Sequence, residues 1–241
     1  MEKDKLYSEN CDQIGDFSFA EKTAEVFDDM LERSVPLYRE LQRMIGELAF
    51  EFAVDGTNVY DLGCSTGITL RTLMNAVNKD VKFVGTDYSN AMLEKCKENL
   101  SKLNDLRACE LVCADLNKGV IVENASIVLL NLTLQFVRPL YRDFIIRSIY
   151  KGLNENGCLI LVEKVLGNDS MFNRMFIKFY YEMKKRNGYS EMEIAQKREA
   201  LENVLIPYRI DENVDLLKNS DFTYVDIFYK WYNFCGFVAV K

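Results

Sequence analysis

Short apolar runs alternate with longer amphipathic stretches through the middle of this 241-residue chain. Apolar runs of about four to eight residues predict strands, and apolar positions three or four apart predict helices. The expected strands are 58–62, 81–87, 110–115, 125–131 and 157–163, with helices at 68–77, 89–103 and 139–153 between them. The continuous apolar run 125–131 indicates a strand buried on both faces. Such alternation predicts a doubly wound, mostly parallel α/β sheet with helices on both faces.

Both ends of the chain depart from this alternation. The remaining expected elements are helices at 20–53, 169–204 and 212–219 and strands at 223–229 and 233–240. Pro36 would begin the second N-terminal helix, a position that favours proline, and Asn187-Gly188 would separate two helices. The last two strands predict an antiparallel hairpin at the edge of the sheet. We therefore expect a single domain over 1–241, with the helices of about 20–53 and a helical insertion at about 165–209 covering the active site.

Composition limits the classes of function. The net charge is −7, the wrong sign for a chain that neutralises nucleic-acid phosphates, so direct nucleic-acid binding is not expected. No apolar run approaches the ~20 residues of a membrane span, and the polar N-terminus resembles no signal peptide, so we expect a cytoplasmic protein. The seven cysteines form no CxxC pair and histidine is absent. We therefore expect no metal site, and the commonest general base is missing.

The first strand ends in a glycine loop with the sequence DLGCSTG, from Asp61 to Gly67. Glycine allows the backbone to approach a ligand closely, and the next helix offers free N–H groups. The spacing from Gly63 to Gly67 is not the dinucleotide-binding G-x-G-x-x-G. An acid just before the loop, Asp61, suits the ammonium group of an amino-acid ligand. A plain tight turn between strand and helix is the alternative interpretation.

Polar residues also follow the next three strands. Asp87, 24 residues after Gly63, is suited to hydrogen-bond both ribose hydroxyls of a nucleoside, although it could simply cap a helix. Asp115 and the backbone N–H of Leu116 are suited to an adenine ring, and Asn131 lies where the other end of the ligand is expected. The alternatives are a capping aspartate and a core asparagine. Because ligands of open α/β sheets bind along this edge, the four strand ends together predict a binding site for S-adenosylmethionine (SAM).

Several stretches together closely resemble the carboxy-S-adenosyl-L-methionine synthase family. They are 31–38 (LERSVPLY), 60–65 (YDLGCS), 131–136 (NLTLQF) and 184–204, which begins KKRNGYSEMEIAQKR. The same pattern includes 15–17 (GDF) and 233–234 (NF), so the resemblance runs from about Leu6 to Lys241. A mostly parallel sheet finished by a C-terminal hairpin is likewise similar to the Rossmann-type fold of class I SAM methyltransferases.

The resemblance implies a transferase of unusual chemistry. Members of the family convert SAM and prephenate to carboxy-SAM and phenylpyruvate, for formation of 5-oxyacetyluridine at the tRNA wobble position. SAM is then a substrate, carboxy-SAM the product, and no metal takes part. Arg198, contributed by the neighbouring subunit of a homodimer, would grip the new carboxylate, and Tyr38 would donate its hydroxyl. The SAM contacts implied by the family pattern are Tyr38, Gly63, Cys64, Ser65, Asp87, Tyr88, Asp115, Leu116, Asn131 and Arg198.

The implied partners are SAM, prephenate, a second copy of the chain and, through the product, a carboxy-SAM-dependent tRNA-modifying enzyme. The family commonly has asparagine where this chain has Tyr88, which could stack on adenine. Taken without the resemblance, Arg198 could be a solvated charge and Tyr38 an ordinary helix aromatic. Two other functions stay open: a SAM-dependent methyltransferase acting on a small molecule or tRNA, and a non-catalytic carrier of SAM or carboxy-SAM.

Overall fold

The structure is a computed structural model that describes residues 2–10, 13–103 and 108–241. Cys11, one of the seven cysteines, lies outside the described residues. The helices are α1 (Glu21–Ser34), α2 (Tyr38–Phe52), α3 (Ile68–Ala76), α4 (Asn90–Leu100), α5 (Pro139–Gly152), α6 (Ser170–Arg186), α7 (Glu191–Leu201) and α8 (Ile210–Lys218). The strands are β1 (Asn58–Leu62), β2 (Lys82–Asp87), β3 (Cys109–Cys113), β4 (Ala125–Asn131), β5 (Leu153–Leu166), β6 (Tyr208–Arg209), β7 (Tyr224–Trp231) and β8 (Phe234–Val240).

One twisted sheet runs through the molecule in the order β3-β2-β1-β4-β5-β8-β7, and β6 pairs with β5 beside this path. The strands β1 to β5 are parallel, whereas β8 is antiparallel to both β5 and β7. The predicted α/β sheet with a C-terminal antiparallel hairpin is therefore confirmed. β4 has the bounds expected from its apolar run, and its first six residues are buried.

Alternate residues of the central strands face two separate cores, as the period of two along a strand requires. In β4, Ile127 and Leu129 pack with residues of α2, α3 and α4 on one face. Their neighbours Val128 and Leu130 pack with residues of α5 and α8 on the other. The fully buried Arg142 of α5 donates hydrogen bonds to the backbone oxygens of Val137, Gln135 and Ile206.

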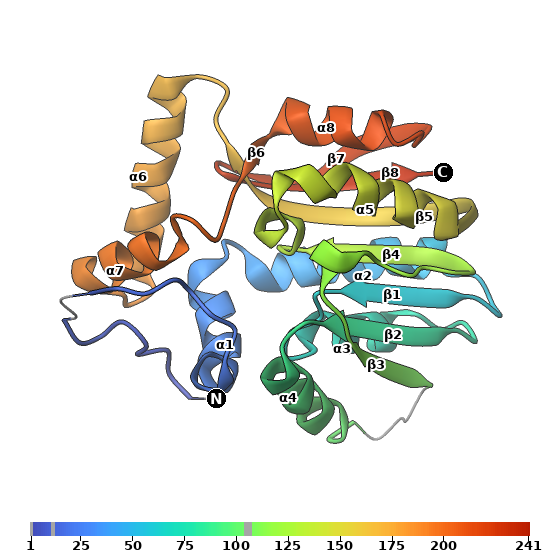
Figure 1. Cartoon of the computed structure of the whole chain (residues 1–241), viewed down its shortest axis with the longest axis horizontal. Coiled ribbons are helices and arrows are strands. Elements are labelled where there is room, and N and C mark those ends of the chain that lie inside the picture. The colour runs from blue at the N-terminus through green and yellow to red at the C-terminus, as the bar shows by residue number, and fades with distance from the viewer. Residues whose placement is uncertain (1, 11–12, 104–107) are drawn as a thin grey trace.

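Three helices lie beyond the carboxyl ends of the parallel strands. Figure 1 shows α1, α6 and α7 on the left of the view, at the end of the sheet toward which β1 and β4 run. A third apolar cluster joins Phe17 and Phe27 to Met92 of α4 and Ala200 of α7. The backbone N–H of Phe17 also donates to the carbonyl of Ala200, so the N-terminal segment is attached to α7.

Two details differ from the sequence prediction. The second helix begins at Tyr38, after Leu37 in a left-handed conformation (φ 50°), so Pro36 lies before the helix rather than at its first position. β5 is also longer than expected, because Leu153 pairs with Ala125 before the register shifts. At its other end, Val165 and Leu166 pair with the two residues of β6.

Candidate SAM site at the strand ends

The loop after β1 is held in a shape that requires glycine. Gly63 and Gly67 have φ of +82° and +83°, in the left-handed region that L-residues rarely adopt. The backbone N–H groups of Gly63 and Cys64 both donate to the carbonyl of Thr86, at 2.7 and 2.8 Å. A Cβ added at Gly63 would lie 2.4 Å from Cγ2 of Thr133. The loop therefore lies closely against the ends of β2 and β4.

Asp87, at the end of β2, lies beside this loop. Its Oδ2 accepts a hydrogen bond from the backbone N–H of Ser65 at 3.0 Å, and its Oδ1 accepts one from Ser89 at 2.9 Å. Burial raises the pKa of Asp87, and these hydrogen bonds oppose that shift. The cap of α4 is the side chain of Ser89, which accepts from Met92 N, so Asp87 is not needed as the helix cap.

The other predicted strand ends meet at the same place. Asp115 accepts two hydrogen bonds from Asn117, and Leu116 is buried beside it. Asn131, at the end of β4, donates from Nδ2 to Thr69 Oγ1 at 3.0 Å. Its Oδ1 is buried and accepts no hydrogen bond from the described residues. One cavity is lined by nine of the ten expected residues, namely Tyr38, Gly63, Cys64, Ser65, Asp87, Tyr88, Asp115, Leu116 and Asn131.

Tyr38 lies at the N-terminus of α2 with 6% of its surface exposed. Burial, followed by the charge of Asp28, raises the pKa of its hydroxyl well above the ordinary value, whereas hydrogen bonds with Thr69 and Gln42 act in the opposite direction. The hydroxyl is therefore a proton donor at neutral pH. Because Thr69 also accepts from Asn131, Tyr38 and Asn131 are connected through a single threonine.

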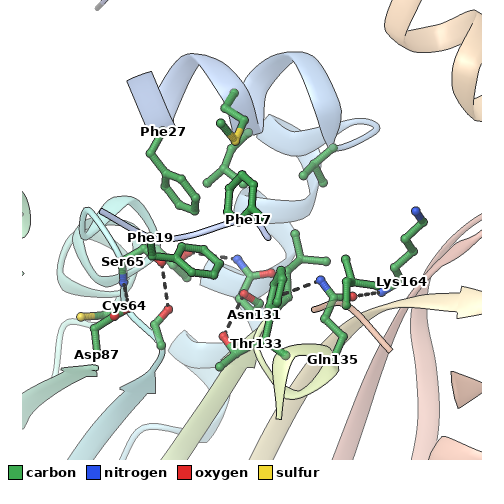
Figure 2. Close-up of a pocket in the computed structure, with 18 of the residues that line it drawn as sticks. Phe17, Phe19, Phe27, Cys64, Ser65, Asp87, Asn131, Thr133, Gln135 and Lys164 are labelled. Atoms are coloured by element: carbon green, nitrogen blue, oxygen red, sulfur yellow. Dashed lines mark hydrogen bonds between the residues drawn. The ribbon is translucent and has the colours of Figure 1, made fainter. Parts of the chain in front are cut away.

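An aromatic cover completes the cavity on the side away from the sheet. Phe19 contacts Phe17, Phe27 and Phe136 edge to face, with ring centroids 5.1, 6.0 and 5.1 Å apart. Figure 2 shows Phe17 and Phe27 above Asn131, with Phe19 below them in the view. Phe19 also contacts the ring of Tyr88 at 6.0 Å. Apolar walls opposite a row of polar strand ends suit a ligand with a flat base and a polar sugar.

The whole chain, and not only its sheet, is similar to proteins of known name. A family model described as a methyltransferase domain matches residues 59–157. The chain is 58% identical over 242 residues to carboxy-S-adenosyl-L-methionine synthase of Methylococcus capsulatus, with 100% of both chains covered. The chain belongs to the carboxy-S-adenosyl-L-methionine synthase family.

A more distant member, the carboxy-SAM synthase of Actinobacillus pleuropneumoniae serotype 5b, is 39% identical over 242 residues and is also covered completely. Among solved structures, an O-methyltransferase family protein from Burkholderia thailandensis has a TM-score of 0.67 at 13% identity. The match covers 93% of this chain and 64% of that one. At this identity the likeness shows the class I methyltransferase fold alone.

Arg198 is the expected residue that the structure does not bring into this cavity. It lies exposed on α7 and lines a neighbouring cavity between α6, α7 and the end of β5. Asp61 is also absent from the lining of this cavity. It is 1% exposed, and burial followed by the charge of Asp87 raises its pKa to about 7.

Several polar residues of the lining were not among the site residues predicted from the sequence, and three of them matter most for the charge and hydrogen bonds of the cavity. Gln135 accepts from the backbone N–H of Lys164 at 2.8 Å, and both side chains line the cavity. Figure 2 shows them together, away from Ser65 and Cys64. Lys197 of α7 is the third, and it is 6% exposed. A lysine on a helix with many charged residues is ordinarily exposed to solvent, so no signal in the sequence indicated that Lys197 would line a cavity.

The thiol of Cys64 is not suited to nucleophilic attack. A hydrogen bond with Cys96, together with burial, raises its pKa far above the ordinary value. Among the described residues, no group of three or more Cys, Asp or Glu side chains could hold a metal ion. In the same part of the chain, no helix is both long and apolar enough to span a membrane. The polar groups that line the SAM cavity include hydroxyl, amide, carboxylate and ammonium groups.

Proposed function

We propose that this protein converts SAM and prephenate to carboxy-SAM and phenylpyruvate. The observation that carries the proposal is the 58% identity, over the full length of both chains, to a relative named carboxy-S-adenosyl-L-methionine synthase. The cavity lined by nine of the ten expected residues supports it. The loop 63–65 would hold the amino-acid part of SAM, Asp87 the ribose, and Asp115 and Leu116 the adenine, with Tyr88 stacked on the base.

The reaction needs no basic side chain, which suits a chain without histidine. Prephenate loses its ring carboxylate as carbon dioxide and its ring hydroxyl as hydroxide, which leaves phenylpyruvate. The hydroxide takes a proton from the SAM methyl group and becomes water. The resulting sulfonium ylide attacks carbon dioxide, forming the new carbon–carbon bond of carboxy-SAM. The protein must hold the two substrates in contact and exclude water, because the ylide and carbon dioxide would otherwise be lost.

Arg198 and Tyr38 are the residues proposed to hold the new carboxylate. Tyr38 lines the SAM cavity and carries a proton to donate, whereas Arg198 is exposed and available to a second subunit. Arginine suits a carboxylate through two parallel hydrogen bonds. The exposed apolar side chains Met171, Phe172 and Met175 support a subunit contact on α6. We include the homodimer, a cytoplasmic location and a carboxy-SAM-dependent tRNA-modifying enzyme as user of the product in the proposal.

The first test is mass spectrometry of the purified protein incubated with SAM and prephenate that carries ¹³C in its ring carboxylate. The expected product is a SAM derivative heavier by one labelled carbon dioxide, formed only when prephenate is present. Unchanged SAM, or transfer of a methyl group to a small molecule or tRNA, would contradict the proposal and favour a methyltransferase. Tightly bound nucleotide without turnover would favour a carrier.

Arg198→Ala tests the shared site. We expect it to abolish carboxy-SAM formation while SAM affinity stays within about tenfold, because the arginine contacts only the new carboxylate. Mixing the Arg198→Ala and Asp87→Ala subunits should restore activity, since a mixed dimer contains one cavity with both residues intact. Failure of the mixture to recover activity, or loss of SAM binding in Arg198→Ala, would refute the assigned role.

A further inference from the structure

Two buried lysines and one half-buried lysine form a cluster beside the SAM cavity. Lys164 lies near the end of β5, Lys184 on α6 and Lys197 on α7. Their ammonium groups lie against the rings of Tyr180 and Tyr189. The distances to the ring centroids are 4.9 Å for Lys164 and 5.8 Å for Lys184 at Tyr180, and 4.9 Å for Lys184 and 5.8 Å for Lys197 at Tyr189. The two tyrosines therefore link the three cations.

The cluster has too few anions for its charge. The ion pair described for these lysines is Lys197 Nζ to Asp4 Oδ2 at 3.7 Å, beyond hydrogen-bonding distance, and Lys197 Nζ is buried without a hydrogen bond. The carboxylate of Asp4 already accepts from the hydroxyl of Tyr189 at 2.6 Å. Glu193, the other acid that acts on Lys184, closes the capping box of α7. Among the described residues, Lys164 and Lys184 have no carboxylate within ion-pair distance.

Burying unpaired ammonium groups is unfavourable in the free protein. Lys184 and Lys197 are 4% and 6% exposed. Burial lowers the pKa of Lys184 to about 7 and of Lys164 and Lys197 to about 8, and repulsion within the cluster contributes for Lys184 and Lys197. A cluster of like charges with a single carboxylate in ion-pair contact is typical of a site whose ligand supplies further opposite charge.

The lysine cluster lies between two cavities. The second cavity lies between α6, α7 and the end of β5, and all three lysines line it. Lys164, Lys197 and Tyr180 also line the SAM cavity, and so do Leu201 and Leu205. An anion held here would lie next to SAM without occupying its site. Tyr180 and the two leucines would provide an apolar contact for a ring.

We propose that Lys164, Lys184 and Lys197 bind the side-chain carboxylate of the second substrate, the one that phenylpyruvate retains. This inference rests on the proposed function, which makes that substrate a dicarboxylate. The ring carboxylate is excluded as the group held by the lysines, because it must leave as neutral carbon dioxide. A cation paired with it would stabilise the ground state more than the transition state and would slow the reaction.

The test is a set of lysine-to-methionine variants, which keep the length and apolar stem of the side chain. Lys184→Met and Lys197→Met should raise the KM for prephenate about tenfold or more, the loss expected for a charge-assisted hydrogen bond. In Lys184→Met the Kd of SAM, measured by calorimetry, should change by less than about twofold, because Lys184 lines the second cavity and not the SAM cavity. The matched control is Lys178→Met, an exposed lysine of the same helix as Lys184, which should change neither constant.

Two further readouts separate a binding role from a structural one. If the lysines serve a ligand, Lys184→Met should melt at an equal or higher temperature without ligand, because it removes a buried charge that has no ion-pair partner among the described residues. Unchanged KM with a lower melting temperature would overturn the proposal. Phenylpyruvate should inhibit competitively with prephenate, and its Ki should rise in the same variants. A Ki that stays constant would overturn the choice of carboxylate, whereas a wild-type protein that makes no carboxy-SAM would refute the proposed function itself.

Discussion

The close approach of Gly63 to Thr133 can be tested by adding a single methyl group. In Gly63→Ala, two separate costs act on the folded state. The backbone at φ +82° disfavours any L-residue, and the new Cβ would lie 2.4 Å from Cγ2 and 2.5 Å from Oγ1 of Thr133. Thr133 lines the SAM cavity, so its displacement should also change the shape of the binding site.

The chain contains the controls that separate the two costs. Gly56 has φ +76° with nothing within 4 Å of an added Cβ. Gly56→Ala therefore measures only the cost of the left-handed backbone conformation, about 1–2 kcal/mol. Gly63→Ala adds overpacking of about 1–3 kcal/mol. For a domain of this size, 1 kcal/mol corresponds to about 2–4 °C in Tm. We expect Gly56→Ala to lower Tm by about 2–8 °C, and Gly63→Ala to lower it by about 2–12 °C more.

The assay is thermal denaturation of both variants, together with calorimetric titration of SAM. Gly15→Ala, at a glycine with open space around it and no positive φ, should leave Tm nearly unchanged. SAM affinity should fall in Gly63→Ala and not in Gly56→Ala. The double variant Gly63→Ala/Thr133→Ala removes both clashing atoms and should recover part of the lost stability. Equal losses of Tm for Gly56→Ala and Gly63→Ala would refute the steric argument.

Three further predictions concern polar residues. Asp87→Asn should weaken SAM binding about tenfold to a hundredfold by calorimetry, because an amide cannot accept from both loop N–H groups and the ribose; unchanged affinity would contradict this. The pKa of Asp61 is raised to about 7 in the folded state, so the folded protein holds this proton more tightly and loses stability as pH rises from about 4 to 7. Asp61→Asn should therefore raise Tm at pH 8 but much less at pH 4, and a pH-independent difference would contradict the assigned shift. Arg142→Met should lower the free energy of unfolding by about 3–5 kcal/mol in urea titrations, because three backbone carbonyls and the buried Glu163 lose their cation; a loss below about 1 kcal/mol would contradict it.

The strand ends were predictable because their signals are local. β1 and β4 have the bounds that their apolar runs indicate, and a polar residue that directly follows a buried parallel strand must lie at the carboxyl edge of the sheet. The break at Asn187-Gly188 also separates α6 from α7, as expected. These features depend on the spacing of apolar positions and on the helix-breaking residues within a few neighbouring positions.

The lysine cluster and the aromatic cover depend instead on packing between distant segments. Lys197 lies on a helix with charged neighbours, and its burial follows from contact with the N-terminal segment that carries Asp4. That segment is polar in sequence, yet Asp4 is 2% exposed. Phe17 and Phe19 lie in the same segment without regular secondary structure. No periodicity within one segment could indicate which faces of these elements meet.

The pairing of β5 with β6 has a consequence for how the molecule opens. Residues 167–207 leave the sheet after Leu166 and return at Tyr208, beside Val165 in the same ladder. Neighbouring strands lie about 4.8 Å apart, so the excursion begins and ends at almost one point. We therefore expect these residues to open as a separate cooperative unit while the sheet stays paired, and their amides should exchange with solvent before those of β4. Such opening would expose Lys184 and Lys197 while the glycine loop and Asp87 stayed in place.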